Sequence, residues 1–166
     1  MKFYWPWNKP KDNYLLLLGF ILLCQFAGGI CSFFTFDAIP TLYIGLNKPF
    51  FSPPNWLFGP VWITLYTLMG ITAYRVWRLV QFKAKSLPFW HVFWTQLILN
   101  TLWSIIFFGL KATGLAVIEI MAMWYFIVRS IQESQKLDDW ASYLLYPYLA
   151  WVSFATILNF AIWFLN

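Results

Sequence analysis

The chain has 166 residues, of which 61% are hydrophobic and 10% are charged, and its formal net charge is +5. A soluble domain carries about 25% charged residues, so this chain lacks the polar side chains that would cover a water-facing surface. The composition therefore excludes a soluble protein and indicates an integral membrane protein. The positive charge does not indicate nucleic-acid binding, because no soluble segment alternates basic and aromatic residues.

Five apolar stretches are each long enough to cross a bilayer as a helix, which takes about 20 residues. In chain order they cover residues 14–36, 56–80, 88–110, 113–131 and 140–165. We expect an all-α integral membrane protein in which residues 1–166 form one domain, a single five-transmembrane-helix bundle with a long ordered loop between helices 1 and 2.

The first stretch is too long for the apolar region of a cleavable signal peptide, so we interpret it as a retained span. It contains both cysteines, Cys24 and Cys31. Seven residues of helix separate them by about 10 Å along the axis, which is too far for a disulfide. We expect both to be small packing residues.

The connection between the first two stretches is long and rich in proline and aromatic residues. Proline fixes φ and removes an amide donor, so no regular helix is expected before Pro54. The aromatic content is too high for a solvated linker, and we predict that the loop folds back onto an apolar surface. The residues predicted to form this lid are Pro49, Phe50, Phe51, Pro53 and Pro54.

Lysine and arginine are distributed unevenly between the two sides that five spans would define. Nine lie on the side of the N-terminus and two, Lys48 and Lys111, on the other. Cytoplasmic loops carry the excess of basic residues. If the protein is in a bacterial inner membrane, the N-terminus is cytoplasmic and the C-terminus and the proline-rich loop are outside. The nine are Lys2, Lys9, Lys11, Arg75, Arg78, Lys83, Lys85, Arg129 and Lys136.

The residue patterns of soluble enzymes and of metal sites are absent from the sequence. The single histidine, His91, has no second ligand at a suitable spacing, so no metal site is expected. Glu119 is the only acid within the predicted spans. Two interpretations of it stay open. It is a functional ionisable group, or it is a carboxylic acid that is protonated or hydrogen-bonded to a neighbouring helix.

Aromatic and amide residues recur on single faces of three predicted helices, in the middle and outer half of the bundle. Asparagine in hydrocarbon needs a partner, so these residues must face inward. Packing between helices explains the pattern, and so does a ligand pocket beneath the loop. The predicted ligand-binding residues are Trp62, Tyr66, Asn100, Trp103, Trp151, Ala155, Leu158 and Asn159.

Three sequence blocks resemble the TspO/MBR family, the tryptophan-rich sensory proteins and the translocator protein, or peripheral-type benzodiazepine receptor. They are L-N-K-P-F-F-S-P-P-N-W-L-F-G-P-V-W from Leu46, N-T-L-W-S-I-I-F-F-G from Asn100 and L-L-Y-P-Y-L-A-W from Leu144. The resemblance implies a pocket inside the bundle for protoporphyrin IX, haem-type tetrapyrroles and isoquinoline or benzodiazepine drugs. The positions that match the family's pocket are Trp62, Asn100, Trp103, Trp151, Ala155 and Leu158.

Three functional hypotheses follow from the residues and the resemblance. The first is a receptor for porphyrins and other hydrophobic molecules, acting as sensor, scavenger or carrier in tetrapyrrole and stress physiology. It requires no cofactor, because the porphyrin is the ligand. The second is a light-dependent porphyrin-degrading enzyme that uses Trp62 and Trp151. The third is a structural membrane protein whose loop binds a protein partner. Analogy with the family also implies a homodimer in the lipid bilayer.

Overall fold

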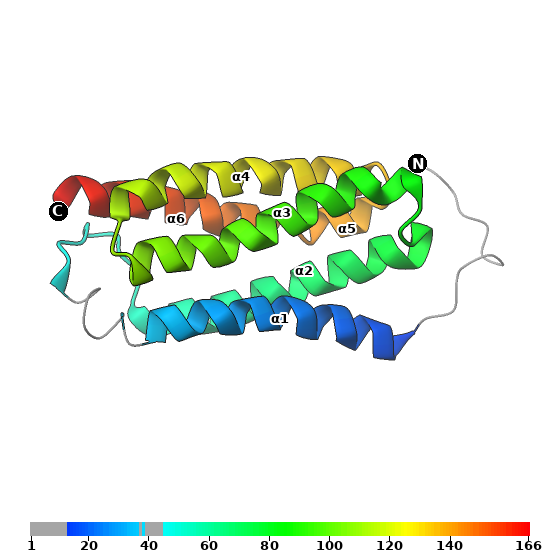
Figure 1. The fold of residues 1–166 in the computed structure, drawn as a ribbon, viewed down its shortest axis with the longest axis horizontal. Helices are drawn as coiled ribbons and strands as arrows, with labels where there is room; N and C mark the ends of the chain where they lie inside the picture. Colours follow the sequence, from blue (N-terminus) through cyan, green and yellow to red (C-terminus); the bar gives the residue numbers. More distant parts are fainter. Residues whose placement is uncertain (1–12, 37, 39–44) are drawn as a thin grey trace.

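The computed structural model describes residues 13–36, 38 and 45–166, and the predicted five-helix bundle is confirmed in it (Figure 1). Five helical segments are long and apolar enough to cross a membrane, and no strand occurs in the described residues. The bounds of these segments are Tyr14–Thr35, Asn55–Val80, Ala84–Gly109, Thr113–Gln135 and Asp139–Leu165.

The first two helices are α1, Tyr14–Phe36, and α2, Phe58–Val80. A short 3₁₀ turn, η3 (Asn55–Leu57), leads into α2. As expected, regular helix begins only after the prolines of the loop, because their rings and missing amides oppose it. Pro60 lies in the first turn of α2, where a missing amide leaves no hydrogen bond unmade.

The third helix, α3 (Leu87–Ser104), is flanked by two irregular turns. A 3₁₀ turn, η4 (Ala84–Ser86), precedes it, and a π turn, η5 (Ile105–Gly109), follows it. The next helix, α4 (Thr113–Gln135), runs four residues beyond the predicted end at residue 131. The chain reverses before α4 at Lys111, whose φ of 55° lies in the left-handed region.

The last predicted span is two helices rather than one: α5, Asp139–Tyr143, and α6, Tyr146–Leu165. The break is explained by Pro147, which has no amide to donate to the carbonyl of Tyr143 and whose ring clashes with that carbonyl. The two pieces together still span the length of the bundle.

The helices lie side by side along the long axis of the molecule (Figure 1), and the backbones of α1 and α2 approach closely at Gly70. A Cβ atom added to Gly70 would lie 2.5 Å from Cα of Ile21. The deepest core, which includes Met69, Phe93 and Tyr148, is fully buried. Cys24 and Cys31 are buried free thiols, as predicted.

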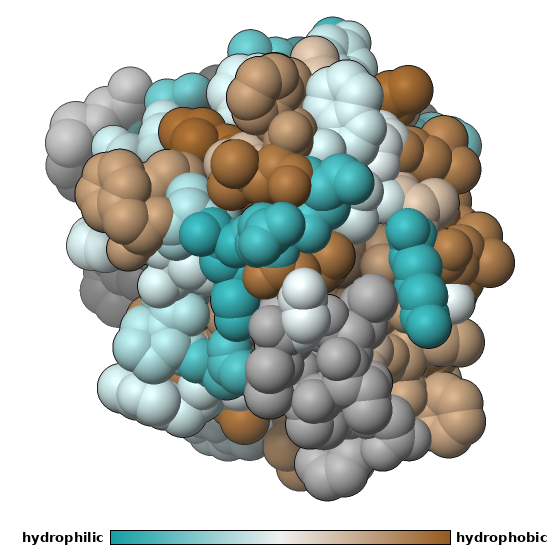
Figure 2. Space-filling view, turned by 90° about the vertical axis from the view of Figure 1, so that its left-hand side faces the viewer, coloured by the Kyte–Doolittle hydropathy of each residue, from teal (hydrophilic) through white to brown (hydrophobic). Residues whose placement is uncertain are grey.

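One end of the bundle, which we call the loop end, carries residues 45–54 and the C-terminus. The amide of Asn47 donates to Oδ1 of Asn166 at 2.9 Å, and Nδ2 of Asn166 donates to the carbonyl of Asn47 at 3.0 Å. Figure 2 shows this end with a hydrophilic band across its middle and hydrophobic residues around much of its margin. That distribution suits the end of a bundle whose sides lie in hydrocarbon.

The opposite end carries the connection between α2 and α3. A bidentate ion pair ties α2 to the turn before α5 there, with Arg75 Nε 2.6 Å from Oδ2 of Asp138 and Arg75 Nη2 3.1 Å from Oδ1. The orientation inferred from charge and the bacterial inner membrane stay predictions. Lys2, Lys9 and Lys11, which contribute to that inference, lie outside the described residues.

Candidate ligand-binding site

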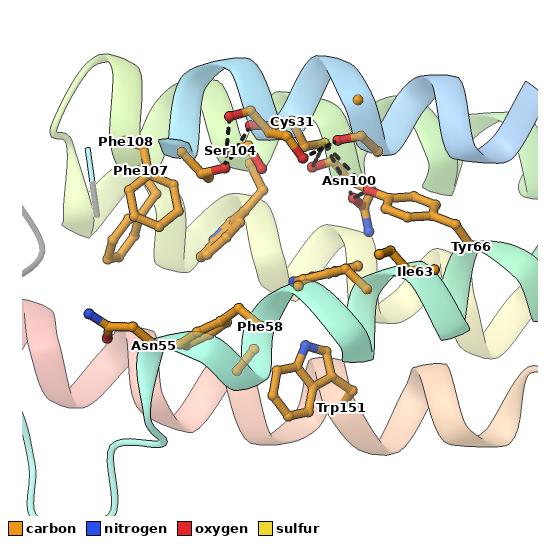
Figure 3. Close-up of a pocket in the computed structure, with 18 of the residues that line it drawn as sticks. Cys31, Asn55, Phe58, Ile63, Tyr66, Asn100, Ser104, Phe107, Phe108 and Trp151 are labelled. Atoms are coloured by element: carbon orange, nitrogen blue, oxygen red, sulfur yellow. Dashed lines mark hydrogen bonds between the residues drawn. The ribbon is translucent and has the colours of Figure 1, made fainter. Parts of the chain in front are cut away.

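A cavity of about 430 Å³ lies in the half of the bundle nearer the loop end (Figure 3). Its walls come from α1, α2, α3 with the π turn η5, and α6. The lining is mostly aromatic and aliphatic, with a few amides and hydroxyls and no charged side chain among the described residues. Pockets for small molecules have about this size and this balance of apolar and polar groups.

The structure brings all eight predicted ligand-binding residues to this one cavity. From α2 come Trp62 and Tyr66, whose ring centroids are 5.5 Å apart, which matches their predicted position on one helix face. That any of the eight contacts a ligand stays a prediction. The eight residues that line the cavity as predicted are Trp62, Tyr66, Asn100, Trp103, Trp151, Ala155, Leu158 and Asn159.

A chain of hydrogen bonds forms the floor of the cavity. Tyr66 Oη donates to Oδ1 of Asn100 at 2.5 Å, and Asn100 Nδ2 donates to Oη of Tyr148 at 2.8 Å. The thiol sulfur of Cys31 lies 3.4 Å from Oη of Tyr66. These links join α1, α2, α3 and α6, and they fix the orientation of Tyr66 and Asn100.

A second amide, Asn159 on α6, ties three helices together beside the cavity. Its Oδ1 accepts from Trp103 Nε1 at 3.0 Å, and its Nδ2 donates to the carbonyl of Thr113 at 3.0 Å. Asn100 and Asn159 are each 2% exposed, so their inward orientation is confirmed. Their bonds are of the interhelical kind that the packing interpretation predicts.

Other polar groups of the cavity remain available to a ligand. The indole N–H groups of Trp62 and Trp151 and the hydroxyl of Ser104 have no hydrogen-bond partner among the described residues. Figure 3 shows Trp151 on α6 with its ring nitrogen turned toward α2. Together with the side-chain amide of Asn55 at the loop end of the cavity, they are the uncommitted donors in a mostly apolar lining.

The five residues predicted to form the lid do not line the cavity. Phe50 is fully exposed, and Phe51 packs edge-on against Phe154 of α6 with ring centroids 6.4 Å apart. The described part of the loop is drawn toward the end of α6 by the bonds between Asn47 and Asn166, and that explains the difference. Residues 39–44 of the loop lie outside the described residues.

The predicted site omitted the wall that α1 supplies. Gln25, deep in this span, donates from Nε2 to the carbonyl of Ile63 at 2.8 Å and to Oγ1 of Thr67 at 2.9 Å. Gly28 is also required there, because a Cβ atom would lie 2.5 Å from the ring of Tyr66. A glutamine within a span, one turn from a pair of glycines, was the available sequence signal.

The π turn adds a lining residue, Phe108, that helical periodicity could not predict, whereas Phe107 follows Trp103 by four residues and was expected on the same face. Leu110 donates its amide to the carbonyl of Ile105, five residues back, at 2.8 Å. This wider turn lets the consecutive residues Phe107 and Phe108 both face the cavity (Figure 3). In a regular helix, neighbouring residues point about 100° apart, and one of the two would face elsewhere.

Glu119 lies outside the cavity lining, on α4, and is 8% exposed. Neither carboxylate oxygen has a hydrogen-bond partner among the described residues. Of the alternatives left open by the sequence, the hydrogen bond from Glu119 to a neighbouring helix is not found in this part of the chain. His91 is exposed at the start of α3, and the described residues contain no group of three potential metal ligands.

Comparison with known proteins identifies relatives that cover nearly the whole chain. The model of the TspO/MBR family matches residues 20–164. The tryptophan-rich protein TspO of Archaeoglobus fulgidus is 43% identical over 93% of this chain and 99% of that protein. The tryptophan-rich sensory protein of Cereibacter sphaeroides is 41% identical over 75% of this chain and 76% of its own length. The human translocator protein is 39% identical over 73% of this chain and 72% of its own length.

Proposed function

The chain belongs to the TspO/MBR family, and from this premise we propose that it is a membrane receptor for porphyrin-type tetrapyrroles and other hydrophobic ligands. Its relatives are named as sensory and translocator proteins, which supports a role as sensor, scavenger or carrier. The site of binding is the cavity between α1, α2, α3 and α6.

The observation that carries this proposal is that the eight residues predicted from the sequence meet around a single cavity. Flat indole and phenyl rings favour a flat, apolar ligand, because stacked and edge-on contacts between rings stabilise beyond area burial alone. No charged residue in the described lining could pair with a carboxylate. The ring system of a porphyrin therefore belongs inside, and its carboxylates belong in water at the loop end.

The uncommitted donors define how a ligand would be oriented. A ligand with a carbonyl or ring-nitrogen acceptor gains hydrogen bonds from Trp62 and Trp151, whose N–H groups otherwise lack an acceptor among the described residues. A purely aliphatic ligand leaves these donors unpaired, which costs free energy in an apolar site.

Titration of protoporphyrin IX into the purified protein, followed by quenching of tryptophan fluorescence, tests the proposal. Trp62→Ala and Trp151→Ala each remove ring contacts and a donor, and we expect each to weaken binding at least about tenfold. Trp140→Ala is the matched control, because Trp140 is 65% exposed on α5 and does not line the cavity. Equal affinities in all three variants and the wild type would contradict the proposal.

Light-dependent breakdown of the bound porphyrin is a second candidate function, favoured by the two indoles in the cavity wall. An indole would donate one electron to the photoexcited porphyrin, and dioxygen would be the terminal oxidant. Under illumination in air, the porphyrin band should bleach faster with the wild type than with the Trp62→Phe, Trp151→Phe double variant. Bleaching that proceeds equally in both proteins, or equally under argon, would exclude this reaction.

A further inference from the structure

In the part of the chain that the structure describes, the cavity opens along one seam of the bundle. Its lining residues from α3, η5 and α6 are all buried or half-buried, whereas several from the other elements are exposed. Ile63 alone is 61% exposed. The exposed lining residues all belong to α1, η3 or α2, so the opening lies between α1 and α2. They are Gly29, Ser32, Asn55, Gly59 and Ile63.

Contacts between α1 and α2 close this seam toward the opposite end of the bundle. At Gly70 the backbones meet, because an added Cβ would lie 2.5 Å from Cα of Ile21. One turn farther toward the loop end, Gln25 bridges the seam. Its Nε2 donates to the carbonyl of Ile63 at 2.8 Å and to Oγ1 of Thr67 at 2.9 Å. The opening therefore ends at Gln25.

Beyond Gln25, missing side chains leave the seam open. Gly29 follows Gln25 by one turn of α1, and Gly59 precedes Ile63 by one turn of α2. A Cβ atom added to either glycine would meet nothing within 4 Å. Figure 3 shows Cys31 on the α1 side of the cavity and Ile63 on the α2 side. No side chain of either glycine fills the space at the edge between these two helices.

The opening faces the hydrocarbon of the bilayer rather than water. On α1, the residues beside Gly29 include Phe26, which is 72% exposed, and Phe33, which is 79% exposed. Large apolar side chains exposed on a membrane-spanning helix lie among acyl chains. A flat, apolar ligand is itself concentrated in hydrocarbon, because water disfavours its surface. Passage through this seam keeps such a ligand out of water.

We propose that ligands enter the cavity sideways from the bilayer, through the seam between α1 and α2, and that Gln25 sets the deep end of this entrance. The inference deepens the proposed function and rests on it, because it names the ligands as flat amphiphiles dissolved in the leaflet at the loop end. From Gln25 to the end of α1 at Phe36 is 11 residues, or about 16 Å of helix.

This entrance suits a ring system that carries carboxylates on one edge. A charge is costly at the bilayer centre and much less so at the interface. The ring can slide in edge-on while the carboxylates stay at the level of the headgroups. Asn55 lies at the loop end of the entrance, and its uncommitted side-chain amide can donate to a carboxylate there.

Stopped-flow quenching of tryptophan fluorescence, with the protein and protoporphyrin IX in lipid vesicles, tests the entrance. Gly29→Phe places a ring in the opening. The association and dissociation rate constants should both fall at least about tenfold, and the dissociation constant should change less than either. Gly19→Phe is the matched control, because Gly19 also lies on α1 with nothing within 4 Å of an added Cβ but does not line the cavity. Equal rates in the two variants, or a fall in only one rate constant, would overturn the proposal.

Gln25→Leu tests the deep end of the entrance. Without the bridge to Ile63 and Thr67 the helices separate more easily, so both rate constants should rise by about two- to tenfold, the factor for one net hydrogen bond. Thr64→Val is the control, because the hydroxyl of Thr64 donates to the carbonyl of Pro60 within its own helix at 2.9 Å. Equal rates in these two variants would overturn the role of Gln25.

Labelling of Cys31 tests the entrance without a porphyrin. Cys31 lines the cavity, whereas Cys24 is 0% exposed and does not, so Cys24→Ala is a suitable background. Pyrene maleimide dissolved in the bilayer should label Cys31 faster than a charged, water-soluble maleimide does, and Gly29→Phe but not Gly19→Phe should slow it. No labelling from the bilayer, or equal labelling in both variants, would overturn the lateral entrance. If protoporphyrin IX does not bind the wild type, the proposed function fails, and this labelling still decides the inference.

Discussion

Replacing Gly70 by alanine tests whether the contact between α1 and α2 depends on a missing side chain. The added Cβ would lie 2.5 Å from Cα and 2.8 Å from the amide nitrogen of Ile21, where ordinary contacts begin at 3.4 Å. Both neighbouring atoms are backbone, so no rotamer change relieves the clash. The two helices must separate locally by about 0.9 Å, the difference between 3.4 and 2.5 Å.

The magnitude follows from two opposing terms. Alanine favours a helix over glycine by about 1 kcal/mol. Overpacking a close contact costs about 1–3 kcal/mol, and more where the backbone cannot move. Because the clash is with backbone atoms, the cost lies at the upper end, about 3 kcal/mol, and we expect Gly70→Ala to lower the free energy of unfolding by about 2 kcal/mol after the propensity gain is subtracted.

Thermal unfolding in detergent, followed by circular dichroism, measures this effect. The matched control is Gly19→Ala, also within a membrane-spanning helix, where a Cβ atom meets nothing within 4 Å. The control should be as stable as the wild type or slightly more stable. If Gly70→Ala unfolds at the same temperature as Gly19→Ala, the inferred close approach of α1 and α2 is wrong.

Three further substitutions probe the site and the opposite end. Gly28→Ala places a Cβ atom 2.5 Å from the ring of Tyr66, so we expect about tenfold weaker porphyrin binding in a fluorescence titration; unchanged binding would show that the ring position is unimportant. Asn159→Leu removes two interhelical hydrogen bonds and should lower the free energy of unfolding by about 1–3 kcal/mol. An unfolding temperature equal to that of the wild type would contradict this expectation. Arg75→Lys loses the bidentate geometry to Asp138 and should cost about 1 kcal/mol, less at high salt; a cost that does not change with salt would contradict the electrostatic origin.

Hydropathy and the 3.6-residue period were sufficient to predict the helices and most of the cavity. The reason is physical: an amide in hydrocarbon has to face a partner, so Asn100 and Asn159 identify the inward faces of α3 and α6. Trp62 and Trp151 then follow from their positions on the inward faces of α2 and α6. These inferences need only local geometry.

The features that sequence reasoning missed depend on contacts between distant segments. The direction of Phe51 follows from the bonds between Asn47 and Asn166, which join positions 119 residues apart. Gln25 gains its role only through the carbonyl of Ile63 on the next helix. The break before α6 is a different case, because Pro147 is a local signal of a helix break. The prediction of one continuous span followed length and hydropathy instead.

The π turn at Ile105–Gly109 behaves as a one-residue insertion that the helix absorbs without moving its ends. Deleting Phe108 would return the segment to ordinary winding and leave a single phenyl group on that wall. The pocket could thus be widened by shortening the chain, and chain length at this one turn becomes a means of tuning which ligands fit.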